Sequence, residues 1–281
     1  MRLCTFVRDG GAPRLGLYED DTIADLTGAG GPTSMLDAIA GDLATVAACC
    51  ARAERLPRAA VTLLAPVPRP GKVLCSGINY RSHAAENPNA VMPTEPFFFA
   101  KLSTSVTGDG AAIVVPARSA QVDYEVEFAA VIGRSLHRAA EADCMAAVFG
   151  YTLLNDVSAR DVQFKDNQIT LGKNFDGFAP IGPCIVTTDE MPRPDRVRLR
   201  SVLNGRTMQD GTTADWLFPL GRLLSELSHV MALESGDIVT TGTPAGVGLF
   251  HTPPVFMRPG GTIVIAADGI GSLTNRMVAP P

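Results

Sequence analysis

The sequence has no long apolar run and no cluster of basic residues. No stretch approaches the ~20 apolar residues needed to span a bilayer. The N-terminal MRLCTFVRDGG turns polar too soon for a secretory signal peptide. The formal net charge is −5, and without a basic tract nucleic acid is not an expected partner. We therefore expect a cytoplasmic protein that contacts neither membrane nor nucleic acid.

Paired cysteines and a phosphate-binding loop are also missing. The six cysteines show neither C-x-x-C pairing nor the spacing of zinc ligands. Scattered thiols in a reducing compartment are the simpler interpretation. The glycine loop TGTPAGVG lacks the G-x-x-x-x-G-K-[ST] spacing of a P-loop. Zinc-finger, disulfide-scaffold and P-loop classes are thereby disfavoured.

The 281 residues fit one large domain, or a catalytic domain with a small appendage. Residues 1–66 contain two strand-like segments and an Ala-rich stretch with helical periodicity, which predicts one helix capped by Thr33 or Ser34. The prolines of LLAPVPRPGK mark a boundary. We predict a small N-terminal α+β domain over 1–66 and a larger domain over 71–281.

Short strands joined by turns dominate the larger domain. The pair Asn204-Gly205 is a strong hairpin signal between two strand-like segments. Regular alternation of strands and helices, which a Rossmann fold or a TIM barrel requires, is absent. We expect an α+β fold that is mostly β, arranged as a β-sandwich or roll.

Acidic residues open a strand that then turns apolar. In DYEVEFAAVIG, Asp123, Glu125 and Glu127 would share one face of a strand, because side chains alternate. A solvated edge strand is the simpler interpretation of a lone E-x-E. The apolar continuation FAAVIG, however, predicts a strand through the interior, where carboxylates cost several kcal/mol each unless neutralised. A bound cation resolves this conflict.

Carboxylate oxygens favour Mg²⁺, Mn²⁺ or Ca²⁺ over zinc. Asp156, which closes the apolar strand YTLLND, is the best candidate for a third oxygen ligand. Ser158 to Gln163 read as the opening of a helix, so Arg160 and Gln163 would share a face. Lys173 follows on a glycine-flanked loop. Taken singly, Arg160 is more simply interpreted as part of a surface salt bridge, and Lys173 as a solvated charge on a loop. Their proximity to the acids in the sequence indicates a site.

Six segments together resemble the fumarylacetoacetate hydrolase family, in order from about residue 71 to the C-terminus: INYRSHAAE, KLSTSVTGDG, DYEVEFAAVIG, LLNDVSARDVQ, GKNFDGFAPIGP and TTGTPAGVG. Residues 1–66 resemble, more weakly, the N-terminal extension of longer bacterial members, which include acylpyruvases and 2-hydroxyhepta-diene-dioate isomerases. The resemblance implies a mixed β-sandwich roll. It also implies a divalent metal, Mg²⁺, Mn²⁺ or Ca²⁺, held by Glu125, Glu127 and Asp156, with Asp123 in a supporting or structural role.

The resemblance further implies a catalytic dyad of His83 and Glu86. Three residues apart on a helical turn, the carboxylate can reach the imidazole, whose other nitrogen can then take a proton from water. An exposed polar residue in a loop is the simpler interpretation of His83.

Family positions that stabilise an oxyanion and grip the substrate fall on Arg160, Gln163 and Lys173. Thr243 matches a threonine that contacts the substrate carboxylate. The segment from 81 to about 95 reads as a lid, and Pro96 to Ala100 as a buried strand. Family members are commonly homodimers, so we expect one here.

The main hypothesis is metal-dependent hydrolysis of a carbon–carbon bond in a small anionic 2,4-diketo acid or acylpyruvate, such as a fumarylpyruvate-like acid. His83, with Glu86, would activate a water that attacks the 4-carbonyl, and the metal and Lys173 would stabilise the departing pyruvate enolate. The alternative is isomerisation of hydroxydienoates, decarboxylation of oxaloacetate-like acids, or lyase or dehydratase chemistry at the same site. A non-catalytic metal-binding protein is the third interpretation.

Overall fold

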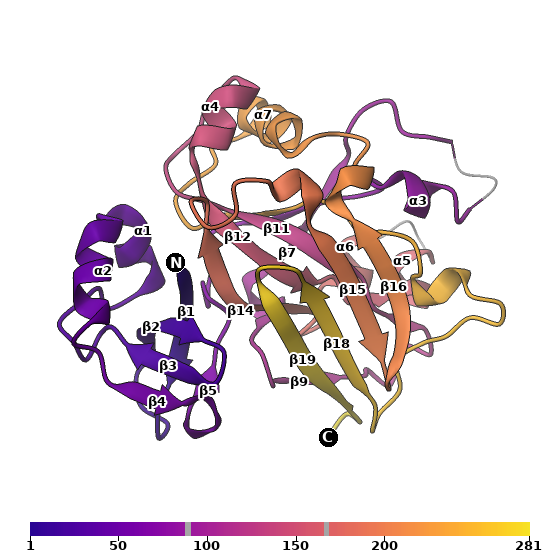
Figure 1. Cartoon of the computed structure of the whole chain (residues 1–281). Helices are drawn as coiled ribbons and strands as arrows, with labels where there is room; N and C mark the ends of the chain where they lie inside the picture. The colour runs from indigo at the N-terminus through magenta and orange to yellow at the C-terminus, as the bar shows by residue number, and fades with distance from the viewer. Residues whose placement is uncertain (88–90, 166–168) are drawn as a thin grey trace.

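A large mixed sheet runs through the whole molecule in the computed structural model, which describes residues 1–87, 91–165 and 169–281 (Figure 1). The sheet has 12 strands, and ten of them form one continuous path. In spatial order these are β4 (Arg55–Pro57), β3 (Thr22–Asp25), β2 (Arg14–Glu19), β1 (Arg2–Val7), β14 (Ala179–Thr187), β12 (Val148–Asn155), β11 (Val126–Ile132), β17 (Ile238–Thr240), β6 (Val73–Ser76) and β7 (Phe98–Lys101). Off this path, β5 (Thr62–Leu63) pairs with β1, and β8 (Val106–Thr107) with β14.

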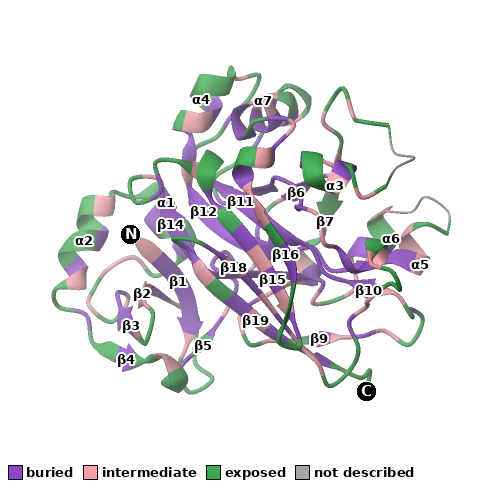
Figure 2. Ribbon diagram, turned by 45° about the vertical axis from the view of Figure 1, so that its right-hand side comes forward, coloured by how far each residue is buried: buried purple, intermediate pink, exposed green. Residues whose placement is uncertain are grey.

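A second sheet of five strands packs on the first. Its spatial order is β16 (Arg206–Thr212), β15 (Arg198–Leu203), β18 (Thr262–Ala267), β19 (Gly271–Val278) and β9 (Ala112–Val114). Phe128 of β11, Leu199 of β15 and Ile263 of β18 belong to one buried cluster, so the core lies between the sheets (Figure 2). Most pairings are antiparallel, which confirms the expected α+β fold with a mostly β, sandwich-like core.

Few helices cover the sheets. α4 (Glu141–Ala146) packs against α7 (Leu220–Val230) at one end of the large sheet (Figure 1). The shorter α3 (Arg81–Ala84), α5 (Arg160–Gln163) and α6 (Ile169–Lys173) lie away from this pair, toward the right of Figure 1. Short 3-10 turns cover Arg58–Ala60, Ser103–Ser105, Pro194–Arg196, Thr213–Asp215 and Gly248–Phe250. No helix in the described ranges has the length and apolar character of a membrane span.

The N-terminal helix is broken in two, so the prediction of one continuous helix was wrong. α1 (Met35–Ala40) is capped by Ser34, whose side chain accepts from the N–H of Asp37, as one of the two expected caps. Gly41 ends α1 in an extended conformation. Asp42 then caps α2 (Leu43–Cys50) by accepting from the N–H of Ala44, because a short acidic side chain competes for backbone donors.

The N-terminal segment shares both sheet and core with the rest of the chain. β1 pairs with β14, so that Leu3 lies opposite Ile185. Leu3, Leu15 and Ala24 belong to the same buried cluster as Ala129 and Val131 of β11. The division at residues 66 and 71 stays a prediction.

The acidic strand is interrupted, which corrects the expectation that its three acids share one strand face. A two-stranded sheet of β10 (Val122–Asp123) and β13 (Ser158–Ala159) ends at Asp123, and β11 begins only at Val126. At the break, side chains replace strand partners: the N–H of Glu125 donates to Asn155 Oδ1 and that of Val126 to Gln209 Oε1. β11 itself is buried along its whole length, as expected.

Other local expectations had mixed outcomes. Asn204 and Gly205 both have positive φ, 51° and 81°, and join β15 to β16 as a hairpin. The strand expected at Pro96 to Ala100 is β7 (Phe98–Lys101), but the expectation that it is buried was wrong, since Phe98 and Phe99 are half-buried and Ala100 is exposed. The predicted lid over 81–95 begins with α3, and its residues 88–90 lie outside the described residues.

Removal of residues 1–66 tests the shared core. We expect the remaining chain to lose cooperative unfolding and to bind a hydrophobic dye, because the edge of β14 and side chains such as Ile185 become exposed. Exposure of each large apolar side chain lowers the free energy of unfolding by about 2 kcal/mol. Thermal unfolding and dye fluorescence measure this. Deletion of the exposed Pro280 and Pro281 is the control. A truncated chain that unfolds like the full protein would contradict the expectation.

Candidate active site

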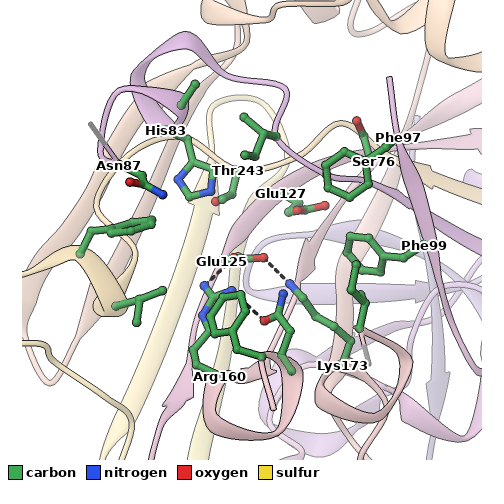
Figure 3. A pocket seen from close by; sticks show the side chains of 18 residues that line it. Ser76, His83, Asn87, Phe97, Phe99, Glu125, Glu127, Arg160, Lys173 and Thr243 are labelled. Carbon is green, nitrogen blue, oxygen red and sulfur yellow. Dashed lines mark hydrogen bonds and ion pairs between the residues drawn. The ribbon is translucent and has the colours of Figure 1, made fainter. Parts of the chain in front are cut away.

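A cavity of about 460 Å³ opens where α3, α5, α6 and the 3-10 turn Gly248–Phe250 surround the carboxyl end of β6 and the start of β11 (Figure 3). Seven of the nine predicted site residues line it: His83, Glu125, Glu127, Arg160, Gln163, Lys173 and Thr243. Glu86 and Asp156 do not line the cavity, but each bonds to a residue that does. Segments far apart in the sequence thus meet at one place.

Glu125 lies at the centre of a buried ion-pair network. One oxygen accepts from Arg160 Nη2 at 2.6 Å and the other from Lys173 Nζ at 2.7 Å. Burial opposes ionisation of Glu125, yet Arg160 and Lys173 outweigh it and hold the pKa of this carboxyl well below its usual range. Lys173 also donates to Asp156 Oδ2 at 2.6 Å, so one ammonium joins two of the predicted metal ligands.

Glu127 is the buried acid at this site that forms no ion pair with a described residue. Its side chain is 1% exposed, and in the described part of the chain its Oε2 accepts no hydrogen bond. Burial first, and then the nearby charges of Asp156 and Glu125, raise the pKa of Glu127 well above its usual value. A bare buried carboxylate is costly, so this position suits a cation.

The local charges do not balance. Among the described residues, the cluster contains four acids and three bases: Asp123, Glu125, Glu127 and Asp156 against Arg160, Lys173 and Lys101. One negative charge is left over when every group is ionised. The donor set and the unpartnered oxygen of Glu127 therefore fit a divalent cation, which would make the cluster net positive.

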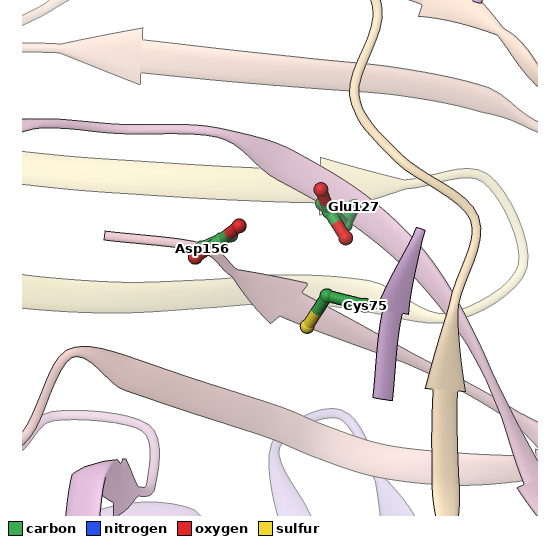
Figure 4. A group of neighbouring side chains, drawn as sticks. All are labelled: Cys75, Glu127 and Asp156. Carbon is green, nitrogen blue, oxygen red and sulfur yellow. The ribbon is translucent and has the colours of Figure 1, made fainter. Parts of the chain in front are cut away.

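The group of possible metal-ligand atoms that lie close together differs from the three metal ligands predicted from the sequence. Cys75 Sγ and one carboxylate oxygen each of Glu127 and Asp156 lie within 4.8 Å of one another (Figure 4). Glu125 is not in this group, and Arg160 and Lys173 hold both its oxygens. Cys75 was missed because a thiol in the apolar strand KVLCSG reads as core. Burial raises the pKa of Cys75 well above its usual value.

Lys101 is a second functional-site residue that the sequence reasoning missed. Its fully buried ammonium donates to the carbonyl oxygens of Val157 (3.1 Å), Lys173 (2.7 Å) and Phe178 (2.7 Å). It also lies 2.7 Å from Asp156 Oδ1. Burial lowers the pKa of Lys101, although Asp156 opposes that shift. Lys101 thereby fixes both the carboxylate of Asp156 and the backbone that presents Lys173. The available signal was one lysine at the end of the apolar run FFFA.

His83 and Glu86 meet as expected. His83 Nδ1 lies 2.6 Å from Glu86 Oε2. Glu86 Oε1 accepts from the N–H of Gly246 at 2.7 Å, which fixes the carboxylate from the other side. Gly246 has φ +105°, and a Cβ there would overlap the carbonyl oxygen of Met208, so the loop needs glycine at this point. The alternative of an exposed loop histidine is wrong, since His83 lies in α3 and is largely buried.

Arg160 is not in a surface salt bridge, because its side chain is buried and its Nε donates to Asp123 Oδ2 at 2.9 Å. Its Nη1 also donates to Gln163 Oε1 at 3.2 Å, as expected for two residues on one helical face. The helix α5 starts at Arg160 rather than at Ser158, which lies in β13. Asp123 also accepts from the N–H groups of Gly248 and Leu249, so it supports the fold of the cavity wall.

Lys173 lies at the end of α6 and is 3% exposed, so the expected loop and the simpler interpretation of a solvated charge were both wrong. The Thr243 hydroxyl donates to Val126 O at 2.9 Å and accepts from Gln209 Nε2 at 2.7 Å. The hydroxyl proton of Thr243 is therefore already donated to a backbone carbonyl of the protein.

Comparison with known proteins gives the class. A family model described as "Fumarylacetoacetate (FAA) hydrolase C-terminal" matches residues 72–278, and one described as "Rv2993c-like, N-terminal" matches residues 1–66. A human protein named "Oxaloacetate tautomerase FAHD2A, mitochondrial" is 41% identical over 233 residues, which cover 82% of this chain and 74% of that protein.

Solved structures agree. A 2-hydroxyhepta-2,4-diene-1,7-dioate isomerase from Mycobacterium marinum is 33% identical with a TM-score of 0.79, covering 99% of this chain and 98% of its own. A maleylpyruvate hydrolase from Sphingobium sp. SYK-6, in complex with manganese(II) and pyruvate, is 32% identical with a TM-score of 0.83 and full coverage of both chains. The chain belongs to the fumarylacetoacetate hydrolase family, as its motifs indicated.

Lys101→Met tests the buried network. The substitution removes the cation beside Asp156 Oδ1 and the donor to three carbonyl oxygens, so we expect the free energy of unfolding to fall by about 3–5 kcal/mol. Chemical denaturation measures the change. Lys165→Met, at an exposed position, removes the same charge and should change stability by less than about 0.5 kcal/mol. Equal stability of the two variants would contradict the network.

Proposed function

We propose that this protein interconverts the keto and enol forms of a short 2-oxo acid, as a metal-dependent tautomerase. The observation that carries the proposal is the contact of His83 with Glu86, because His83 lines the same cavity as a buried cluster of acids and bases. The names of the human relative and of the isomerase from M. marinum support this choice. They favour the isomerase alternative of the sequence analysis over carbon–carbon hydrolysis.

Glu125, Glu127 and Asp156 are the proposed metal ligands, with Mg²⁺ or Mn²⁺ as the preferred ions; Glu125 would bind the ion in exchange for one of its contacts with Arg160 and Lys173. The unpartnered oxygen of buried Glu127 and the excess negative charge support this assignment. The manganese ion in the related maleylpyruvate hydrolase supports it as well. When bound, such a cation supplies positive charge that lowers the cost of an enolate.

The dyad supplies the proton transfer. His83 Nε2 takes a proton from C3 of the keto acid while Glu86, on Nδ1, orients the ring and stabilises its charged form. The C–H electron pair becomes the new C2=C3 bond, and the proton is returned to the 2-oxygen to complete the enol. The reverse sequence converts enol to keto. Lys173 adds a positive charge at the cavity floor, where the carboxylate head of the substrate would bind.

Hydrolysis of an acylpyruvate is the second candidate. The same His83 could take a proton from a water, and the related structure that holds pyruvate is a maleylpyruvate hydrolase. The two reactions differ in their products, since hydrolysis releases pyruvate and a second acid. A coupled assay for pyruvate separates them.

His83→Asn should lower the rate of oxaloacetate tautomerisation by about 10²–10⁴-fold, since a general acid–base is lost. The ultraviolet absorbance of the enol follows the reaction in the presence of Mg²⁺. His229→Asn is the matched control, because His229 is exposed and its Nδ1 bonds to Ser225 O within its own helix. An unchanged rate in His83→Asn would remove the proposed base.

Glu127→Gln should weaken Mn²⁺ binding by roughly tenfold or more, since even a lost partner of a metal ligand costs that much. Calorimetric titration of the protein with Mn²⁺ measures the affinity without reference to activity. Glu141→Gln, at an exposed position of α4, serves as the control. Equal affinity in both variants, or tautomerisation that survives chelation of the metal, would refute the proposed site.

A further inference from the structure

Apolar side chains, which together form an apolar wall, line the cavity both beside His83 and opposite it (Figure 3). Of the 12 phenylalanines in the chain, only Phe97, Phe164 and Phe250 are exposed, by 44%, 56% and 38%, and all of them line this cavity. Phe99, Ile169 and Leu249 are further apolar side chains that line the cavity. Aromatic rings exposed to water at one place mark a surface that binds an apolar group.

Two rings of this wall, Phe97 and Phe99, have close neighbours within the protein. The ring of Phe97 packs on the backbone of Gly77, where a Cβ would overlap it, and the N–H of Gly77 donates to Phe97 O at 2.9 Å. Lys173 Nζ lies 5.0 Å from the centre of the Phe99 ring. Figure 3 shows Phe97 and Phe99 across the cavity from His83. A preorganised apolar wall contributes more to binding than a flexible one.

The basic side chains that line the cavity already have acidic partners within the protein. Among the described lining residues the bases are Arg160, Lys173 and His83, and each already contacts an acid of the protein. The sequence outside the described ranges adds none, since residues 88–90 are Pro-Asn-Ala and 166–168 are Asp-Asn-Gln. A second carboxylate placed against the phenylalanines would lose its hydration without gaining a cation.

We propose that the preferred substrate is a 2-oxo monocarboxylic acid with an apolar tail, either aryl or branched alkyl, rather than a dicarboxylic acid. The proposal rests on the proposed tautomerase function. The carboxylate and oxo groups occupy the end of the cavity near Glu125 and Lys173, and the tail lies against Phe97, Phe164 and Phe250. A cavity of about 460 Å³ suits such a ligand, since it falls in the range that binds drug-sized molecules.

The first experiment compares two acids on the wild-type protein with Mg²⁺. The kcat/KM for tautomerisation of phenylpyruvate should exceed that for oxaloacetate by roughly tenfold to a hundredfold, the ratio expected from burial of one ring. The enol absorbance of each acid gives the rates. Equal or higher kcat/KM for oxaloacetate would overturn the proposed tail preference while leaving the tautomerase function intact.

A charge placed on the apolar wall should reverse the preference. Phe164→Lys supplies a cation for a second carboxylate, so the ratio of kcat/KM for phenylpyruvate to that for oxaloacetate should fall by about tenfold or more. Val230→Lys adds the same charge on the exposed face of α7, outside the cavity, and should leave the ratio unchanged. The same ratio in both variants would contradict a role for Phe164 in selecting the tail.

Binding separates the two proposals. N-phenyloxamate and oxamate share a head group that cannot tautomerise and differ in the aryl tail. In calorimetry with Mg²⁺, N-phenyloxamate should bind at least tenfold more tightly and with a more negative heat capacity change, because apolar surface is buried. Equal affinities would overturn the tail preference alone. If neither compound binds and neither acid is turned over, the proposed function fails and this inference fails with it.

Discussion

The buried contact of Lys173 with Glu125 and Asp156 is the interaction on which the rest of the site depends. Carboxylates in a protein interior are tolerated only when paired, and one ammonium here joins two that come from separate strand ends. Lys101 continues the chain of charges to the other oxygen of Asp156. Glu127 forms no ion pair of this kind with a described residue. When all its groups are ionised, the cluster therefore keeps one negative charge in excess.

The fold is irregular where it serves this network. A continuous strand from Asp123 to Ile132 would place its acids on one face. In the structure, Asp123 ends β10 and Glu125 lies in the break before β11, and both bond to Arg160. Asn155 and Gln209 take over the backbone donors that the break releases. Gln209 also donates to Thr243, so the loop that supports the dyad is tied to the same point.

Local patterns in the sequence predicted features that depend on near neighbours, such as the E-x-E pair and the Asn204-Gly205 turn, and the family resemblance placed the dyad at His83 and Glu86. The contributions of Lys101 and Cys75 depend on strand order, because β7 and β6 reach the acids only through pairing with one another and with β17. The pairing of β1 with β14 is equally non-local. The break between α1 and α2 could have been predicted from the sequence, because Gly41 is a typical residue at the end of a helix and Asp42 a typical N-cap of the next one. The periodicity of apolar residues alone does not reveal this break.

Tautomerase, isomerase and hydrolase share one requirement, which is stabilisation of negative charge beside a carboxylate head. They differ in what lies next to the base: hydrolysis needs a water within reach of His83, and tautomerisation needs that volume filled by the substrate's own C3. The Phe250 ring centre is 6.0 Å from that of His83, so a tail packed on this phenylalanine displaces water from the neighbourhood of the imidazole. The apolar wall that would select the substrate thereby also favours proton transfer over attack by water.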